Sequence, residues 1–98
     1  MKINFTQKHI HLSDEQKAYI EGKLENLKKY RKVEDESTAI RVDVEYLESK
    51  SSDSNIFLTV NMVLPHTTVR AEVDGQKVEE AIDLAYEKLE KQLEKLKG

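Results

Sequence analysis

The sequence GQKVEEAIDLAYEKLEKQLEKLKG, residues 75–98, decides the fold because its apolar residues recur with the spacing of an amphipathic α-helix. At about 100° per residue, one face of this helix collects Val78, Ile82, Ala85, Leu89, Leu93 and Leu96. A helix with a single apolar stripe has to pack that stripe against another layer of structure. We therefore expect a long final helix that covers one face of a sheet, with Leu89 packed near Val60.

The charged residues of the same helix are sorted by sign. One flank of the stripe carries Lys77, Lys88, Lys91 and Lys95, and the opposite side carries Glu79, Asp83, Glu87, Glu90 and Glu94. A local basic flank on a chain of formal net charge −3 indicates one directed contact with an anionic partner. The alternative is a solvated helix in which Glu/Lys pairs add only a few tenths of a kcal/mol each.

The rest of the chain alternates between strand and helix patterns. Ser13 followed by Gln16 is typical of a capping box, so a first helix is expected from Ser13 to about Tyr30. Its apolar positions are Leu12, Ile20, Leu24 and Leu27. Period-two alternation predicts four strands, at residues 2–7, 39–47, 56–64 and 67–74. The polar residues 48–55 and the Pro65-His66 pair are expected to reverse the chain.

This order predicts an α+β fold, β-α-β-β-β-α, in one domain formed by residues 1–98. A strand–helix–strand crossover is right-handed in about 98% of cases, which makes the first two strands parallel. Short reversals make the remaining strands antiparallel. The sheet is thus four-stranded and mixed, with two roughly parallel helices on one face. The carboxyl ends of both helices then lie together, so Lys28, Lys29, Arg31 and Lys32 are expected to join the lysine flank in one basic surface.

Composition excludes several classes of protein. The 98 residues include no cysteine, which rules out disulfides, thiolate catalysis and cysteine-based zinc sites. No apolar run approaches the ~20 residues of a membrane span, and the first residues lack the apolar core of a signal peptide. We expect a cytoplasmic protein with no membrane partner.

The sequence also offers little for catalysis. His9, His11 and His66 are too few for a stable metal site, and the three glycines are isolated, so no phosphate loop is present. The carboxylates lie on solvated faces, without the apolar surroundings that a general acid needs. We expect no enzyme activity, cofactor, metal or small-molecule substrate. Phe57 alone is too little for a base-stacking sheet, so any RNA is expected on the helices.

Five segments together resemble the ribosome hibernation-promoting factor / ribosome-associated inhibitor A (protein Y) family in its short form. They are MKINFTQK at residues 1–8, GKLENLKKY at 22–30, VRAEVDGQK at 69–77, EAID at 80–83 and KLEKQLEKLK at 88–97. The resemblance implies a fold like that of double-stranded-RNA-binding domains. It further implies binding to the small (30S) ribosomal subunit, in the channel used by messenger and transfer RNA, which blocks translation and preserves idle ribosomes under stress. A short form lacks the additional carboxyl-terminal domain that long forms use to pair ribosomes.

The resemblance therefore implies a ribosome-binding factor that contacts ribosomal RNA. The candidate contact residues are Lys23, Lys28, Lys29, Arg31, Lys32, Lys88, Lys91 and Lys95. Two alternatives stay open at this point. One is a protein-interaction module that binds a partner such as a transcription regulator, and the other is a generic binder of double-stranded RNA.

Overall fold

The computed structural model describes residues 2–30, 37–48 and 55–96, and its elements follow the predicted order. The strands are β1 (Lys2–Lys8), β2 (Ala39–Tyr46), β3 (Ile56–Val63) and β4 (Thr68–Gly75). The helices are α1 (Asp14–Glu25), continued by a 3₁₀ turn η1 (Asn26–Lys29), and α3 (Val78–Lys95). The predicted α+β fold is confirmed. Its likeness to double-stranded-RNA-binding domains stays a prediction.

The four strands form one sheet in the order β1-β2-β3-β4. β1 is parallel to β2, whereas β2, β3 and β4 are antiparallel neighbours, as the crossover rule and the short reversals predict. Alternation places every second side chain on the face toward the helices. In the middle of the sheet this face carries Val42, Val60 and Ala71, which are register partners and are buried.

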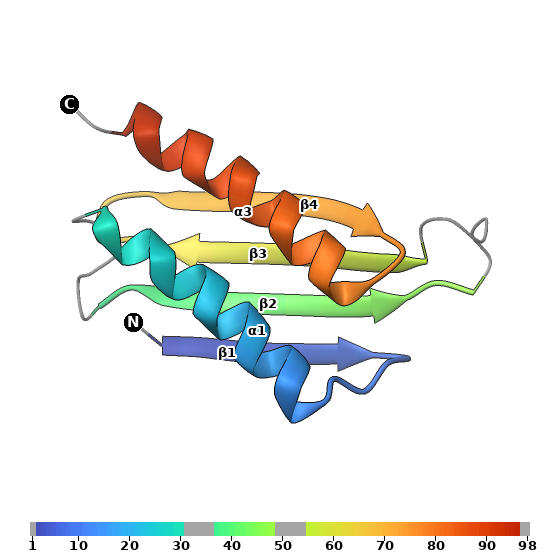
Figure 1. The fold of residues 1–98 in the computed structure, drawn as a ribbon. Helices are drawn as coiled ribbons and strands as arrows, with labels where there is room; N and C mark the ends of the chain where they lie inside the picture. Colours follow the sequence, from blue (N-terminus) through green and yellow to red (C-terminus); the bar gives the residue numbers. More distant parts are fainter. Residues whose placement is uncertain (1, 31–36, 49–54, 97–98) are drawn as a thin grey trace.

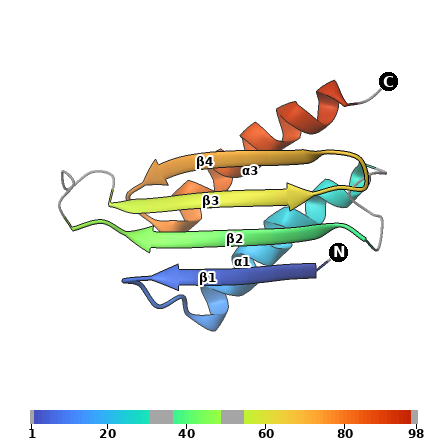
Figure 2. The ribbon, with the colours of Figure 1, turned by 180° about the vertical axis from the view of Figure 1, so that it is seen from behind.

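Both helices cover the same face of the sheet and leave the other face open (Figures 1 and 2). α1 and α3 run in the same sense, and their carboxyl-terminal ends lie at the same end of the sheet. α3 crosses the sheet obliquely, so its last turns extend past β4, which is one edge of the sheet. This arrangement decides which flank of α3 meets α1 and which meets β4.

The entry into α1 shows why the helix starts where it does. The Ser13 hydroxyl accepts a hydrogen bond from the Gln16 N–H at 3.1 Å, and the Gln16 side chain accepts one from the Ser13 N–H at 3.0 Å. This is the predicted capping box, which satisfies two backbone donors that the first turn leaves open. The Gln7 side chain accepts a further hydrogen bond from the Leu12 N–H at 2.6 Å.

The core lies between the sheet and the two helices. The predicted stripe of α3 is buried from Val78 to Leu93, and Leu96 is half-buried at the end. From α1 and the segments beside it, the core receives Leu12, Ile20, Leu24 and Leu27. Leu89 and Val60 are both fully buried, in agreement with the predicted register of the last helix.

Candidate nucleic-acid interface

The first half of the α1–α3 contact is organised by Asp83. Its carboxylate lies 3.3 Å from the amine of Lys23 and accepts a hydrogen bond from the Tyr19 hydroxyl at 2.9 Å. The Lys23 amine also lies 5.0 Å from the centroid of the Tyr86 ring, within cation–π range. The hydrogen bond to Asp83 raises the pKa of Tyr19, because it stabilises the protonated hydroxyl. Lys23 is therefore held between the helices and is only partly exposed.

Glu90 organises the second half of this contact. Its carboxylate lies 2.6 Å from the Lys29 amine and is approached at 3.4 Å by the hydroxyls of both Tyr30 and Tyr86. The hydrogen bond to Lys29 lowers the pKa of Glu90, and the same bond raises the pKa of Lys29. Burial raises the pKa of the Tyr30 hydroxyl. Lys29 is thus a charged amine that already has a carboxylate partner.

The opposite flank of α3 faces β4. The Lys88 amine donates a hydrogen bond to the Glu72 carbonyl oxygen at 3.1 Å. One turn later, the Gln92 side chain donates to the Arg70 carbonyl at 2.7 Å and accepts from the Arg70 N–H at 3.3 Å. Lys91 and Lys95 are exposed, and among the residues that the structure describes neither amine lies in an ion pair with a carboxylate.

The described residues divide the expected basic surface into two groups. The acidic flank of α3 is the one that meets α1, through Asp83 and Glu90, so the lysine flank lies on the far side of α3. Lys28 is exposed and lies 3.5 Å from Glu25 of its own helix. The other two predicted contacts, Arg31 and Lys32, fall outside the described residues. Among the described residues, one basic group therefore lies at the end of the first helix and another on the lysine flank of α3, with the ion-paired α1–α3 contact between them.

Sequence reasoning missed the role of Asp83 and Glu90. They are seven residues apart, which is two helical turns, so they share a flank of α3 with Tyr86 between them. Lys23 and Lys29 have nearly the same spacing on the first helix. Two carboxylates on one helix and two lysines at a similar spacing on a parallel helix can pair with each other. This pattern was the signal in the sequence that could have predicted the ion pairs between the helices.

The open face of the sheet pairs its own charges. Arg41 lies 3.2 Å from Asp43 on β2, and Arg70 lies 3.2 Å from Glu72 on β4. Arg70 also donates a hydrogen bond to the side-chain oxygen of Asn61 at 3.1 Å. A face whose guanidinium groups already have carboxylate partners has little net charge for phosphate. The prediction that the helices carry any RNA contact agrees with this arrangement.

A metal site would need at least three His, Cys, Asp or Glu side chains close together. The described part of the chain holds no such cluster. Within the same residues, no helix is both long and apolar enough to cross a membrane.

Comparison with protein families identifies the chain. The family model described as Sigma 54 modulation protein / S30EA ribosomal protein matches residues 3–98. The chain belongs to this family. A curated S30EA relative, the ribosome hibernation promotion factor of Lactococcus lactis subsp. cremoris strain MG1363, is 31% identical over 97 residues. That alignment covers 99% of the chain but 50% of the relative, so the chain spans about half the length of this relative.

Two solved structures share the S30EA fold seen here. The ribosomal subunit interface protein from Coxiella burnetii has a TM-score of 0.79 and 25% identity, covering 99% of this chain and 98% of that one. The protein Y N-terminal domain from Thermus thermophilus also has a TM-score of 0.79, with 23% identity, covering 99% and 100%. At this identity, the match to the Thermus thermophilus domain supports the fold alone. Together with the family match, these findings confirm the resemblance inferred from the sequence.

Proposed function

We propose that this S30EA-family chain is a ribosome hibernation factor that binds ribosomal RNA of the small (30S) subunit in the channel used by messenger and transfer RNA. The observation that carries the proposal is the family match across residues 3–98, joined to a relative named for ribosome hibernation. Bound there, the protein blocks translation by occupying the channel and needs no catalysis. This role places it in the cytoplasm, acting as one domain of residues 1–98.

The lysines of the last turns of α3 are the best candidates for phosphate contacts. Lys91 and Lys95 are exposed and lie one turn apart, so both amines can reach the same RNA backbone. Lys88 continues this group along the helix, although its amine also bonds the Glu72 carbonyl. Amines in this position neutralise phosphates and release counterions, which is the main source of affinity for nucleic acid.

The 3₁₀ turn η1, which continues α1, supplies a second, separate basic group. Lys28 and Lys29 are exposed, and Lys29 is held in place by Glu90. Lys23 is a weaker candidate because it lies between the helices beside Asp83 and Tyr86. Since the acidic flank of α3 separates the two groups, we infer that they contact two different stretches of RNA backbone.

This separation favours folded ribosomal RNA over a simple duplex as the target. A straight duplex laid across both helices would bring its phosphates against the Lys23–Asp83 and Lys29–Glu90 pairs, whose charges largely cancel and offer little net attraction. Folded RNA can place one backbone at each of the two basic groups. We therefore infer that a generic duplex binds more weakly than the small subunit does.

Sucrose-gradient sedimentation tests this function. The purified chain is mixed with small subunits, with large subunits or with buffer alone, and fractions are probed for the protein. We expect it to migrate with small subunits and to stay there when a large excess of unrelated RNA duplex is added. Release by the duplex would support generic duplex binding instead, and no migration with small subunits would refute the proposal.

A further inference from the structure

The outer edge of β4 is covered by α3 over only part of its length. Arg70 bonds to Gln92 through both backbone groups, so its N–H and carbonyl point away from β3. Antiparallel pairing alternates with period two, so the backbone groups of Glu72 and Asp74 point outward as well. The outward carbonyl of Glu72 accepts a hydrogen bond from the Lys88 amine. Among the described residues, none bonds the outward N–H of Glu72 or either outward backbone group of Asp74.

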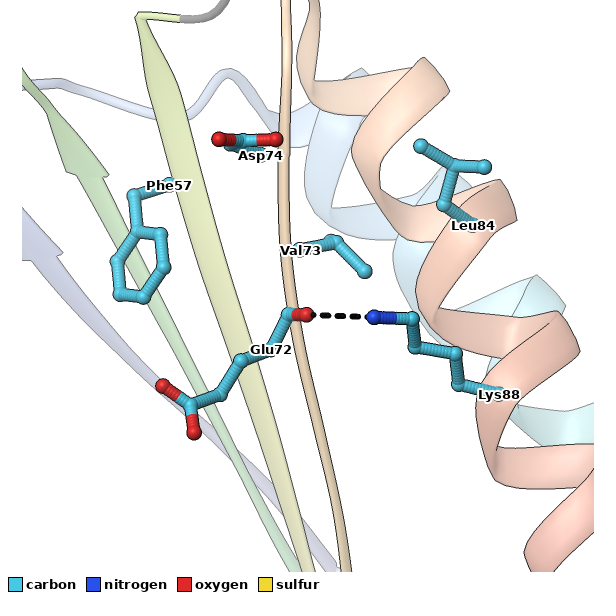
Figure 3. Close-up of a pocket in the computed structure, with 6 residues that line it drawn as sticks. All are labelled: Phe57, Glu72, Val73, Asp74, Leu84 and Lys88. Atoms are coloured by element: carbon cyan, nitrogen blue, oxygen red, sulfur yellow. Dashed lines mark hydrogen bonds between the residues drawn. The ribbon is translucent and has the colours of Figure 1, made fainter.

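A surface pocket of about 250 Å³ adjoins this uncovered stretch. It is lined by Phe57, Glu72, Val73, Asp74, Leu84 and Lys88, drawn in Figure 3. Leu84 projects from α3 toward β4, with Val73 of the strand opposite it. Leu84 is 42% exposed. An apolar side chain placed here would bury this surface.

The two sides of the β4 edge differ in charge. On the side toward α3, Lys88 supplies an amine beside the pocket. On the open face, Asp74 and Glu72 are exposed carboxylates, and the Glu72 side chain, which already pairs with Arg70, points away from the helix (Figure 3). A strand laid along the edge would alternate its side chains between these two environments. Charge complementarity then demands an acidic residue on one side and basic residues on the other.

We propose that the β4 edge at Glu72–Asp74 is a docking site for an extended segment of another protein, which adds as a fifth strand. The segment runs antiparallel to β4. On the side toward α3, it places an apolar side chain between Leu84 and Val73 and, two residues later, an acidic side chain at Lys88. On the open face, it places basic side chains opposite Asp74 and Glu72. The uncovered backbone groups supply the hydrogen bonds of strand addition, and the pocket and charges supply its specificity. This site shares Lys88 with the proposed RNA contact, whereas Lys91 and Lys95 are not among the residues that line it.

The test uses a synthetic peptide and the whole chain. The probe is acetyl-Thr-Lys-Leu-Lys-Glu-Thr-amide, whose lysines share one face when it is extended and whose Leu and Glu share the other. The control, acetyl-Thr-Lys-Lys-Leu-Glu-Thr-amide, has the same composition with the two faces mixed. Binding is followed by NMR of the ¹⁵N-labelled protein. We expect saturable shifts at the Glu72, Val73 and Asp74 amides with the sorted peptide, and affinity at least ~10-fold lower with the mixed peptide.

Matched variants assign the binding to this edge. Leu84→Gln removes the exposed apolar contact, and Asp74→Lys reverses the charge that meets a lysine of the peptide. We expect each to weaken binding of the sorted peptide by ~10-fold or more. Glu87→Gln, on the other flank of α3, should leave it unchanged. Lys88 is kept in all variants because the proposed RNA contact uses it, so a loss here leaves the ribosome proposal untouched.

Several outcomes would overturn this inference. Equal binding of both peptides, or no shift at Glu72 and Asp74 at millimolar peptide, would contradict strand addition. If a short RNA duplex shifts the same amides and the peptide does not, the edge serves nucleic acid. If sedimentation equilibrium shows a dimer of the chain that Leu84→Gln dissociates, the edge serves a second copy and not another protein.

Discussion

The Glu90 carboxylate of α3 lies 2.6 Å from the Lys29 amine at the end of η1, and this pair ties the carboxyl-terminal ends of the two helices together. The hydroxyls of Tyr30, which follows η1, and of Tyr86 on α3 complete the contact, each 3.4 Å from the Glu90 carboxylate. The arrangement has two effects. It fixes the relative position of the two basic groups, and it partly neutralises the lysine nearest to α3.

The Lys29–Glu90 pair predicts a specific pH dependence of stability. The pKa of Glu90 is lowered from 4.5, so the unfolded chain binds more protons at this site, and the stabilisation is lost as pH falls below about 4.5. The pKa of Lys29 is raised from 10.5, so the stabilisation is lost again as pH rises above that value. Glu90→Gln should therefore lower the free energy of unfolding by a constant amount between these limits, and the difference from the parent should shrink outside them.

Urea denaturation of both proteins across pH measures this difference. Lys29 is exposed and Glu90 is partly exposed, so the effect is expected to be small and to decrease with salt. Glu87→Gln is the control, because it removes an exposed carboxylate of the same helix without touching Lys29. A difference for Glu90→Gln that does not vary below pH 4.5 would contradict the pair as described.

Leu89 and Leu84 form a matched test of the register of α3. Leu89 is fully buried, and its truncation to alanine should lower the free energy of unfolding by ~2–5 kcal/mol. Leu84 is 42% exposed, and the same truncation there should change it by roughly 0.5 kcal/mol or less. Chemical denaturation compares the two. If both variants lost the same stability, α3 would be rotated relative to the sheet.

Gln92 is expected to protect the edge of β4. Its side chain forms hydrogen bonds with both backbone groups of Arg70, so Gln92→Ala should expose the Arg70 N–H to solvent. Native-state hydrogen exchange should then be faster at Arg70, while exchange at the buried residues Val69 and Ala71 changes little. Lys91→Ala, one residue earlier, is the control. Unchanged exchange at Arg70 would show that the side chain does not cover this edge in solution.

Salt dependence separates RNA contacts from a protein contact. We assume that four lysines each neutralise a phosphate: Lys28, Lys88, Lys91 and Lys95. A plot of the logarithm of the binding constant K for the small subunit against the logarithm of the salt concentration should then fall with a slope of ~0.7–0.9 for each contact. Removing two of these charges should lower the slope in proportion. A profile that is nearly flat in salt would favour a protein partner.

Much of the fold could be predicted because local patterns determine it. The spacing of Ser13 and Gln16 predicts a cap that forms as expected, and period-two alternation around Val60 predicts a strand with the correct buried face. The stripe through Leu89 predicts both the helix and its register. The cap depends on residues that are close in sequence. The strand and the helix each have a single apolar face, and that face must be the one that is buried.

The arrangement of charges could not be predicted in the same way. A helical wheel shows that α3 has a lysine flank and an acidic flank, but not which flank lies beside α1. That choice depends on the hand of the packing and on the oblique path of α3, which places Glu90 beside Lys29 and Lys88 beside Glu72. For this reason the sequence did not show that the acidic flank of α3, and not its lysine flank, packs against α1.

The central claim is that the exposed lysines of the last turns of α3 hold the protein on the small ribosomal subunit. The most direct test is sedimentation of Lys91→Glu/Lys95→Glu with small subunits, beside Lys2→Glu/Lys8→Glu, which makes the same change of charge on β1. All four lysines are exposed, so both variants should stay folded by circular dichroism. We predict that the α3 variant no longer migrates with the small subunit while the β1 variant does. A folded α3 variant that still migrates with it would contradict this account.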